Sequence, residues 1–142
     1  MKMDFLNEFN RIMDGTKNIA LATTVEDIPN VRLVNFYYNP ENKGVVYFAT
    51  FKGSSKLLEF SNNDKTAFTT IPVNSSEHVR VINASVQKSN LTIYDLKEEF
   101  VKKHPDYEIT IAQAGQMLEV YELHFKEANV ILGIKQAAKI AL

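Results

Sequence analysis

The feature that most constrains the fold is a series of short segments in which side chains alternate between two faces, with turn residues between the segments. In residues 31–38, Val31 and Leu33 belong to one face, and Arg32 and Val34 belong to the other, a period typical of a β-strand. Further strand-like runs, each ended by Gly, Pro, Asn or Asp, cover residues 19–25, 45–50, 65–73 and 78–87. We also expect residues 117–125 and 128–134 to form a closing hairpin.

Two amphipathic segments interrupt the strands. Residues 3–14 carry apolar side chains at helical spacing and are followed by Gly15, which predicts a helix that covers part of a core. Residues 92–104 predict a second helix that ends before Pro105, and residues 106–116 fit either a short helix or a loop. We therefore expect a mainly β, α+β fold: an antiparallel barrel, closed or partly closed, of about six to seven strands with peripheral helices.

Composition limits the classes of function. The 142 residues favour a single domain spanning residues 1–142, and 16 basic against 17 acidic residues leave no broad basic surface for nucleic acid or an anionic membrane. The chain has no cysteine, which excludes disulfides and thiolate metal sites and fits a cytoplasmic location. We find no signal-peptide core in the first 13 residues, and no apolar run reaches the roughly 20 residues of a membrane span.

The corner between a strand and a predicted short helix, residues 50–57, is the first candidate site. Gly53 allows the backbone to turn, Ser54 and Ser55 suit a helix N-cap, and Lys56 adds positive charge. A helix N-terminus with hydroxyl and ammonium donors attracts anions. The same residues also fit a capped surface helix with solvated lysines, and both interpretations stay open at this point.

Arg32 favours the anion interpretation. It lies inside an otherwise apolar strand, and its planar guanidinium suits a phosphate group. If residues 31–38 pair with residues 45–50 through the turn at 40–44, Arg32 comes close to Thr50 and the corner. By contrast, His78, His104 and His124 have no spacing typical of a metal site, so we expect no metal.

The order of these motifs resembles the flavin-binding split-barrel family related to pyridoxamine 5′-phosphate oxidase. The similarity covers roughly residues 5–134 and is sharpest over residues 29–60, which contain Pro29-x-x-Arg32 and then Tyr-Phe-Ala-Thr-x-x-Gly-Ser-Ser-Lys. The resemblance implies an FMN cofactor and a homodimer with two flavins at its interface. It also implies cofactor-binding roles for a set of ten residues: Arg32, Leu33, Val34, Asn35, Ala49, Thr50, Ser54, Ser55, Lys56 and His78.

Within that set the resemblance assigns different parts of the cofactor. Arg32, Thr50, Ser54 and Lys56 would hold the FMN phosphate, and the backbone of residues 33–35 would border the isoalloxazine ring. His78 falls where the oxidase has a flavin-contacting glutamine, whereas Ser55 stands where the oxidase has a second basic residue. The oxidase's substrate-binding Arg-Pro stretch and its C-terminal segment with Trp and Arg are missing, so we do not expect vitamin B6 oxidation.

Three functions remain open at the level of the sequence. The first is an FMN-dependent oxidoreductase that acts on an unidentified small molecule, with NADH or NADPH as a possible reductant and with no catalytic side chain identified. The second is a non-enzymatic flavin-binding module or electron carrier. The third is haem binding on the same scaffold, which would require an iron ligand from the protein.

Overall fold

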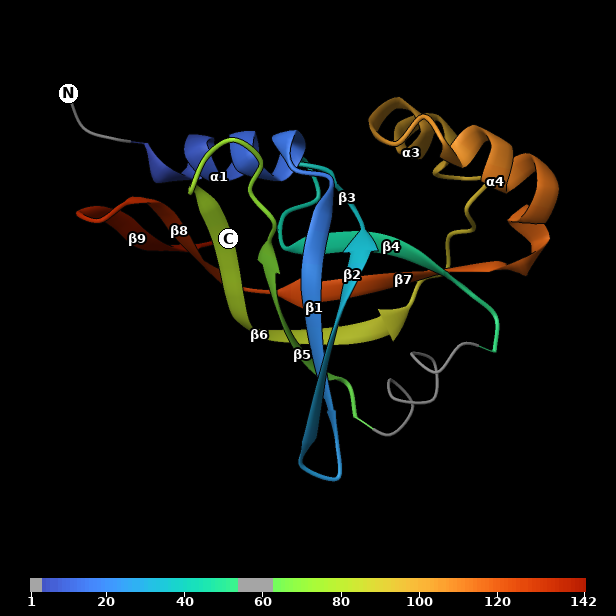
Figure 1. Ribbon diagram of the computed structural model, residues 1–142, viewed down its shortest axis with the longest axis horizontal. Coiled ribbons are helices and arrows are strands. Elements are labelled where there is room, and N and C mark those ends of the chain that lie inside the picture. The colour runs from blue at the N-terminus through green and yellow to red at the C-terminus, as the bar shows by residue number, and fades with distance from the viewer. Residues whose placement is uncertain (1–3, 54–62) are drawn as a thin grey trace.

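The structure, a computed structural model, describes residues 4–53 and 63–142 (Figure 1). The described residues form one nine-stranded sheet in which every pairing is antiparallel. The strands are β1 (Asn18–Val25), β2 (Ile28–Asn35), β3 (Tyr37–Tyr38), β4 (Val45–Phe51), β5 (Lys65–Thr70), β6 (His78–Lys88), β7 (Leu118–Phe125), β8 (Glu127–Gly133) and β9 (Gln136–Ala141). The helices are α1 (Phe5–Gly15), α3 (Lys97–Lys103) and α4 (Tyr107–Ala114), with a 3-10 turn, η1, at Gly115–Met117.

The sheet curves into a split barrel because the chain changes its pairing partner between β2 and β3. The order is β2-β1-β5-β6-β7-β4-β3, so the two ends of the order, β2 and β3, are adjacent in the chain. Only Phe36 separates them: β2 pairs with β1, whereas β3 pairs with β4 through Tyr37–Tyr47 and Tyr38–Val46. The barrel is therefore closed beside β3 and split between β2 and β4.

The first turn of the barrel is a tight hairpin. Val25 pairs with Ile28, and the two residues between them, Glu26 and Asp27, have φ values of 52° and 64°. Two consecutive positive φ angles are typical of the type I′ turn, whose twist matches that of the strands on either side. The turn is thus limited to Glu26 and Asp27, and the β1–β2 hairpin extends away from β4 and β7 (Figure 1).

A large apolar core fills the barrel and extends under α1. Inward-facing residues of the strands, such as Leu21, Phe48 and Leu123, are fully buried. Helix α1 lies across one end and inserts Phe9, whose ring meets that of Tyr38 edge-on at a centroid distance of 5.3 Å. Asp4 caps this helix by accepting hydrogen bonds from the N–H groups of Leu6 and Asn7 at 3.1 and 3.2 Å. The helix expected over residues 3–14 is confirmed as Phe5–Gly15.

A second, smaller core lies on the outer face of β4 and β7. Helices α3 and α4 cover this face, and Phe100 and Ile111 pack there against Val45 and Tyr47. Strand β4 is thus buried on both faces, which explains its nearly continuous apolar sequence. The helix expected over residues 92–104 is shorter than predicted, because residues 93–96 form turns before α3 begins.

Two expected strand pairings are wrong. Residues 31–38 do not pair with 45–50 as one hairpin, since Phe36 lies between two strands with different partners. The N–H of Phe36 donates to the Lys17 carbonyl at 3.3 Å, and its own carbonyl accepts from Nε2 of His104 at 2.9 Å. These two hydrogen bonds fix the position of Phe36, where the chain stops pairing with β1 and starts pairing with β4.

The expected closing hairpin is also different. Strands β7 and β8 both pair with β6, and the register is the same on either side of Lys126: Ala84 lies opposite Phe125 and Arg80 lies opposite Asn129. Residues 118–133 therefore form one bent strand rather than a hairpin. The true closing hairpin is β8–β9, and together with β3 it brings the described strands to nine, above the expected six to seven.

Candidate functional site

Polar side chains lie on the inner face of the barrel, on the β1–β2 hairpin and at the ends of β4, β6 and β7. Alternation along β2 places Arg32 on the same face as Val34 and Phe36, which are both buried in the core. Arg32 itself is half-buried, and its Nη1 donates to the hydroxyl of Thr23 at 3.1 Å. Thr23 is buried and lies in line with Leu21 on β1. The core of the barrel thus ends in an arginine and a threonine.

Thr50 contributes a second buried hydroxyl on the opposite side of the split. It follows Val46 and Phe48 along the inner face of β4 and pairs with Glu119 of β7. Directly after β4, the N–H of Lys52 donates to the Met117 carbonyl at 2.8 Å. Gly53 then has a φ of 78°, a left-handed conformation that favours glycine. The predicted turn at Gly53 is confirmed.

An acidic residue with two partners completes the open end. Oε1 of Glu119 lies 3.6 Å from Nζ of Lys88, and Oε2 accepts a hydrogen bond from the hydroxyl of Tyr121 at 3.2 Å. Burial, assisted by the Glu119 carboxylate, raises the pKa of Tyr121 to about 12. Tyr121 therefore keeps its proton at neutral pH and donates it to Glu119.

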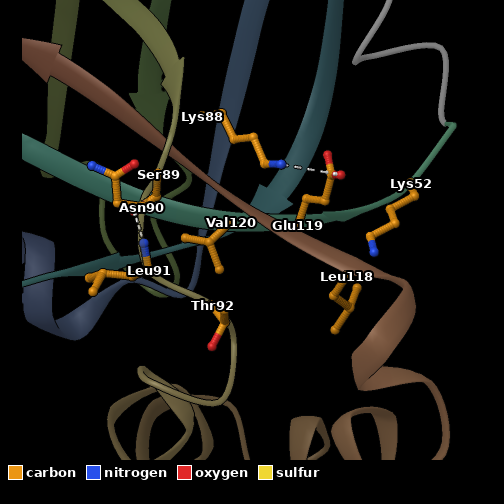
Figure 2. Close-up of a pocket in the computed structure, with 9 residues that line it drawn as sticks. All are labelled: Lys52, Lys88, Ser89, Asn90, Leu91, Thr92, Leu118, Glu119 and Val120. Atoms are coloured by element: carbon orange, nitrogen blue, oxygen red, sulfur yellow. Dashed lines mark hydrogen bonds and ion pairs between the residues drawn. The ribbon is translucent and has the colours of Figure 1, made fainter.

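A cleft of about 410 Å³ adjoins these residues at the ends of β4, β6 and β7 (Figure 2). Its charged lining residues are Lys52, Lys88 and Glu119, so the cleft has an excess of positive charge. Figure 2 shows the side chains of Lys88 and Glu119 directed toward each other. The rest of the wall comes from residues 89–92 and from Leu118 and Val120. An anionic ligand with an apolar part suits such a surface.

The structure brings some of the expected site residues together and separates others. Arg32 and Thr50 both face the barrel interior beside the split. Among the described residues β2 pairs with β1 alone, so the other backbone edge of residues 33–35 faces the split. The side chain of Leu33 is exposed, that of Val34 is buried in the core, and Oδ1 of Asn35 accepts from Nδ2 of Asn18 at 2.7 Å.

Ala49 and His78 lie apart from this group. Ala49 is on the outer face of β4, where it packs against the second core under α3 and α4. His78 begins β6 at the end opposite Lys88, ten residues and roughly 33 Å of extended strand away. Its Nδ1 lies 2.9 Å from the Ser76 carbonyl. Ser54, Ser55 and Lys56 lie outside the described residues.

Four residues of the open end were not predicted from the sequence: Thr23, Lys88, Glu119 and Tyr121. Their inward direction follows from alternation along their strands, but only the sheet order brings β6 and β7 next to β4. Residues 4–53 and 63–142 contain no group of three or more His, Asp or Glu side chains that could hold a metal ion. Within the same ranges, no helix is both long and apolar enough to cross a bilayer.

The fold and the sequence together identify the family. The profile of the pyridoxamine 5′-phosphate oxidase-like family matches residues 12–137, which is most of the chain. The protein therefore belongs to the pyridoxamine 5′-phosphate oxidase-like family. No curated protein matches the sequence.

Solved structures with low sequence identity share the fold. General stress protein 26 from Bacillus anthracis str. Sterne superimposes with a TM-score of 0.76 at 15% identity, over 99% of this chain and 100% of that one. A heme binding protein from Mycobacterium smegmatis superimposes with a TM-score of 0.74 at 13% identity, over 99% of this chain and 59% of that one. A FAD-binding protein from Mesorhizobium loti superimposes with a TM-score of 0.61 at 12% identity, over 86% of this chain and 90% of that one. At these identities the similarity establishes the split-barrel fold and nothing finer.

Proposed function

We propose that this protein binds FMN at the open end of its barrel and acts as an FMN-dependent oxidoreductase on a small molecule. The observation that carries the proposal is the position of Arg32, a half-buried guanidinium on the inner face of the strand that borders the split. Its guanidinium donates to Thr23, and the planar fork of N–H donors also suits the oxygens of a phosphate group. In this proposal the anion is the FMN phosphate, and Thr50 donates to it from the opposite side of the split.

The donor set fits such a group. Guanidinium, hydroxyl and ammonium groups are the usual phosphate partners. Arg32 on β2 supplies the first, and Thr50 and Lys52 at the end of β4 supply the other two. Ser54, Ser55 and Lys56 follow at once in the sequence and remain part of the proposed phosphate site. The Glu119 carboxylate does not oppose anion binding strongly, because Lys88 and Tyr121 both contact it.

The flavin supplies hydride or electron transfer when it is bound, and the protein supplies binding, orientation and exclusion of water. Arg32 and Thr50 would fix the phosphate, and the free backbone edge of residues 33–35 would border the ring. Ala49 and His78 stay in the proposed set only as backbone or partner-protomer contacts, because neither side chain joins the group around Arg32. The proposal includes a single domain and a cytoplasmic location, with NADH or NADPH as the possible reductant.

The outer face of β2 supports the homodimer in this proposal. Val31 and Leu33 are 64 and 65% exposed and project from the face opposite to that of Arg32 and Val34. Adjacent exposed apolar residues on one strand are typical of an interface between protein chains. A second copy on this face would lie directly against the split, so each flavin site would border both protomers.

Flavin titration of two arginine variants tests the binding site. We expect Arg32→Ala to weaken FMN binding about 10- to 100-fold, since one charge-assisted hydrogen bond is worth about 1.5–3 kcal/mol. Arg80→Ala is the matched control, because Arg80 is also a strand arginine but is exposed on the outer face of β6. Quenching of FMN fluorescence gives both affinities. Equal FMN affinity in the two variants would refute the assignment of Arg32.

Stopped-flow reduction separates an enzyme from a passive flavin carrier. With FMN bound, an oxidoreductase is reduced by NADH or NADPH faster than free FMN, whereas a carrier is not. Haem binding is the second candidate, favoured by the fold shared with the M. smegmatis heme binding protein. Addition of hemin would then give a Soret shift that is lost in His78→Ala, and absence of the shift would exclude it.

A further inference from the structure

A second cavity lies on the outer face of the sheet, where β7 runs into β8 (Figure 1). It has a volume of about 420 Å³ and shares none of its described lining residues with the cleft near Lys88. Its walls are the turn before β4, the middle of β6 and the bend at Lys126. Cavities that bind small molecules start at about 300 Å³, so this one has room for a small ligand.

The imidazole of His124 is held in one orientation on the wall of this cavity. Its Nε2 lies 2.7 Å from Oε1 of Glu122, and Oε2 of the same carboxylate accepts a hydrogen bond from the Ser89 hydroxyl at 2.6 Å. An ionised carboxylate only accepts hydrogen bonds, so Nε2 carries the proton and the neutral ring keeps a lone pair on Nδ1. Within residues 4–53 and 63–142 no group bonds to this Nδ1, which is therefore available to a ligand.

The strand register places further side chains beside the ring. Val45 of β4 and Ser85 of β6 lie on either side of His124, and paired residues of an antiparallel ladder project to the same face. A β-bulge in β6, where its pairing with β5 shifts register, leaves Asn83 exposed next to them. In the described part of the chain, the Ser85 hydroxyl and the Asn83 amide have no hydrogen-bond partner. Both line the cavity and can bond to a ligand.

Positive charge is in excess at this cavity. Lys43 and Lys126 line it with two exposed ammonium groups. Among the described lining residues Glu127 supplies a carboxylate, but its Oε2 lies 3.7 Å from Nζ of Lys139, which offsets part of its charge. A phosphate monoester carries about 1.5 to 2 negative charges at neutral pH, so it suits a pair of ammonium groups better than a single-charged anion does.

Backbone hydrogen bonds fix the two segments that carry these lysines. The N–H of Phe125 donates to the Gly44 carbonyl, and the N–H of Leu142 donates to the Lys126 carbonyl, each at 2.9 Å. The N–H of Gly44 also donates to the Tyr38 hydroxyl at 3.1 Å. The walls of the cavity are therefore in place before a ligand arrives, which lowers the entropy lost on binding.

We propose that this cavity binds a small phosphate monoester that carries a hydroxyl group on its carbon chain. Lys43 and Lys126 attract the phosphate, and Ser85 and Asn83 donate hydrogen bonds to its oxygens. The ligand hydroxyl donates to Nδ1 of His124, the acceptor that Glu122 keeps oriented. The site is separate from the proposed flavin site, and neither depends on the other.

Titration with glycerol 3-phosphate tests the proposal on the full chain. The imidazole C–H resonances of the three histidines are followed by NMR at constant pH, and the His124 resonance is identified by its absence in His124→Gln. We expect a saturable shift of the His124 resonance and none of the His78 and His104 resonances. Absence of a saturable shift at His124 would overturn the proposal, whatever the result of the flavin titration.

Three lysine variants test the contribution of charge. Lys43→Gln and Lys126→Gln should each weaken binding about threefold to fivefold, the effect of one partly solvated charge contact. Lys135→Gln is the matched control, because it removes the same charge from an exposed lysine in the turn between β8 and β9. Equal weakening in all three variants would show that only the net charge matters and would refute the site.

Two further probes test the hydroxyl. Propyl phosphate has the same carbon chain and phosphate as glycerol 3-phosphate but no hydroxyl, so it should bind several-fold more weakly. Glycerol, which has the hydroxyls without the phosphate, should give no shift of the His124 resonance. If propyl phosphate bound as tightly as glycerol 3-phosphate, the contact assigned to His124 would be wrong, and the proposal would fail.

Discussion

At the scale of single residues, Tyr121 shows how the barrel changes the chemistry of a side chain. Its ring stacks on Phe48 at a centroid distance of 6.0 Å, and its hydroxyl donates to Glu119. The neutral phenol satisfies both neighbours, whereas a phenolate would be poorly solvated and would face a carboxylate. The open end thus contains one phenol that resists ionisation.

Alkaline titration of the tyrosines tests this conclusion. Because burial and Glu119 raise the pKa of Tyr121 to about 12, the folded protein should bind its phenolic proton more tightly than the unfolded chain. The resulting contribution to stability is complete below about pH 10 and is lost as the pH rises through about 12. Burial also raises the pKa of Tyr37, Tyr38 and Tyr47, so Tyr121→Phe should reduce the amplitude of the tyrosinate absorbance step near pH 12 rather than abolish it. Tyr94→Phe, at an exposed tyrosine, is the matched control. An unchanged amplitude near pH 12 in Tyr121→Phe would contradict the assignment.

The sequence predicts single residues of the candidate site only where local rules suffice. Alternation identifies Arg32 as sharing a face with apolar neighbours, and the turn at Gly53 follows from the chemistry of glycine. The pair Lys88–Glu119 could not be predicted, because these residues come from strands 31 positions apart that meet only in the folded sheet. The bond from Arg32 to Thr23 depends in the same way on the β1–β2 register.

At the scale of elements, Phe36 explains why the strand pairing was mispredicted. Residues 31–38 alternate between two faces in the sequence, so nothing local shows that two strands meet there. The break depends on groups distant in sequence: the Lys17 carbonyl and the His104 ring form hydrogen bonds with the backbone N–H and carbonyl of Phe36. The bend at Lys126 could not be predicted from the sequence either, because a single residue between two β segments does not determine which strand each segment pairs with. Helix α1 was predicted well, since its apolar stripe and its cap are both local.

The turn before β4 depends on Gly44. This residue has a φ of 78°, and a Cβ there would come within 2.4 Å of the Phe125 carbonyl oxygen. Both the strained backbone and the contact with rigid backbone should make Gly44→Ala destabilising by about 2–3 kcal/mol or more. Urea denaturation measures the change in the free energy of unfolding.

Gly15→Ala is the matched control for this substitution. No atom lies within 4 Å of a Cβ at Gly15, and its φ is not in the left-handed region. As a helix residue it should tolerate alanine or gain up to about 1 kcal/mol. A loss of stability at Gly44 no larger than at Gly15 would contradict the proposed strain.

At the scale of the whole molecule, the unpaired apolar face of β2 is expected to decide the oligomeric state. Leu33→Asp would place a charge in the proposed interface between two copies, so we expect a monomer in size-exclusion chromatography with light scattering. Flavin affinity should fall in parallel if each site borders both protomers. Ile134→Asp is the control, because Ile134 is fully exposed in the turn between β8 and β9. A Leu33→Asp protein that remains dimeric would exclude this face as the interface.

The two-residue ladder between β3 and β4 has a consequence for motion. Tyr37–Tyr47 and Tyr38–Val46 are the pairs that join the two sides of the barrel next to the split, whereas neighbouring strands such as β4 and β7 share seven pairs. Opening of this seam would break few hydrogen bonds, so its free energy is expected to lie below that of global unfolding. Amide hydrogen exchange in residues 37–38 should therefore outpace exchange in β7. A ligand that contacts both Arg32 and Thr50 would link β2 to β4 across the split and slow that exchange.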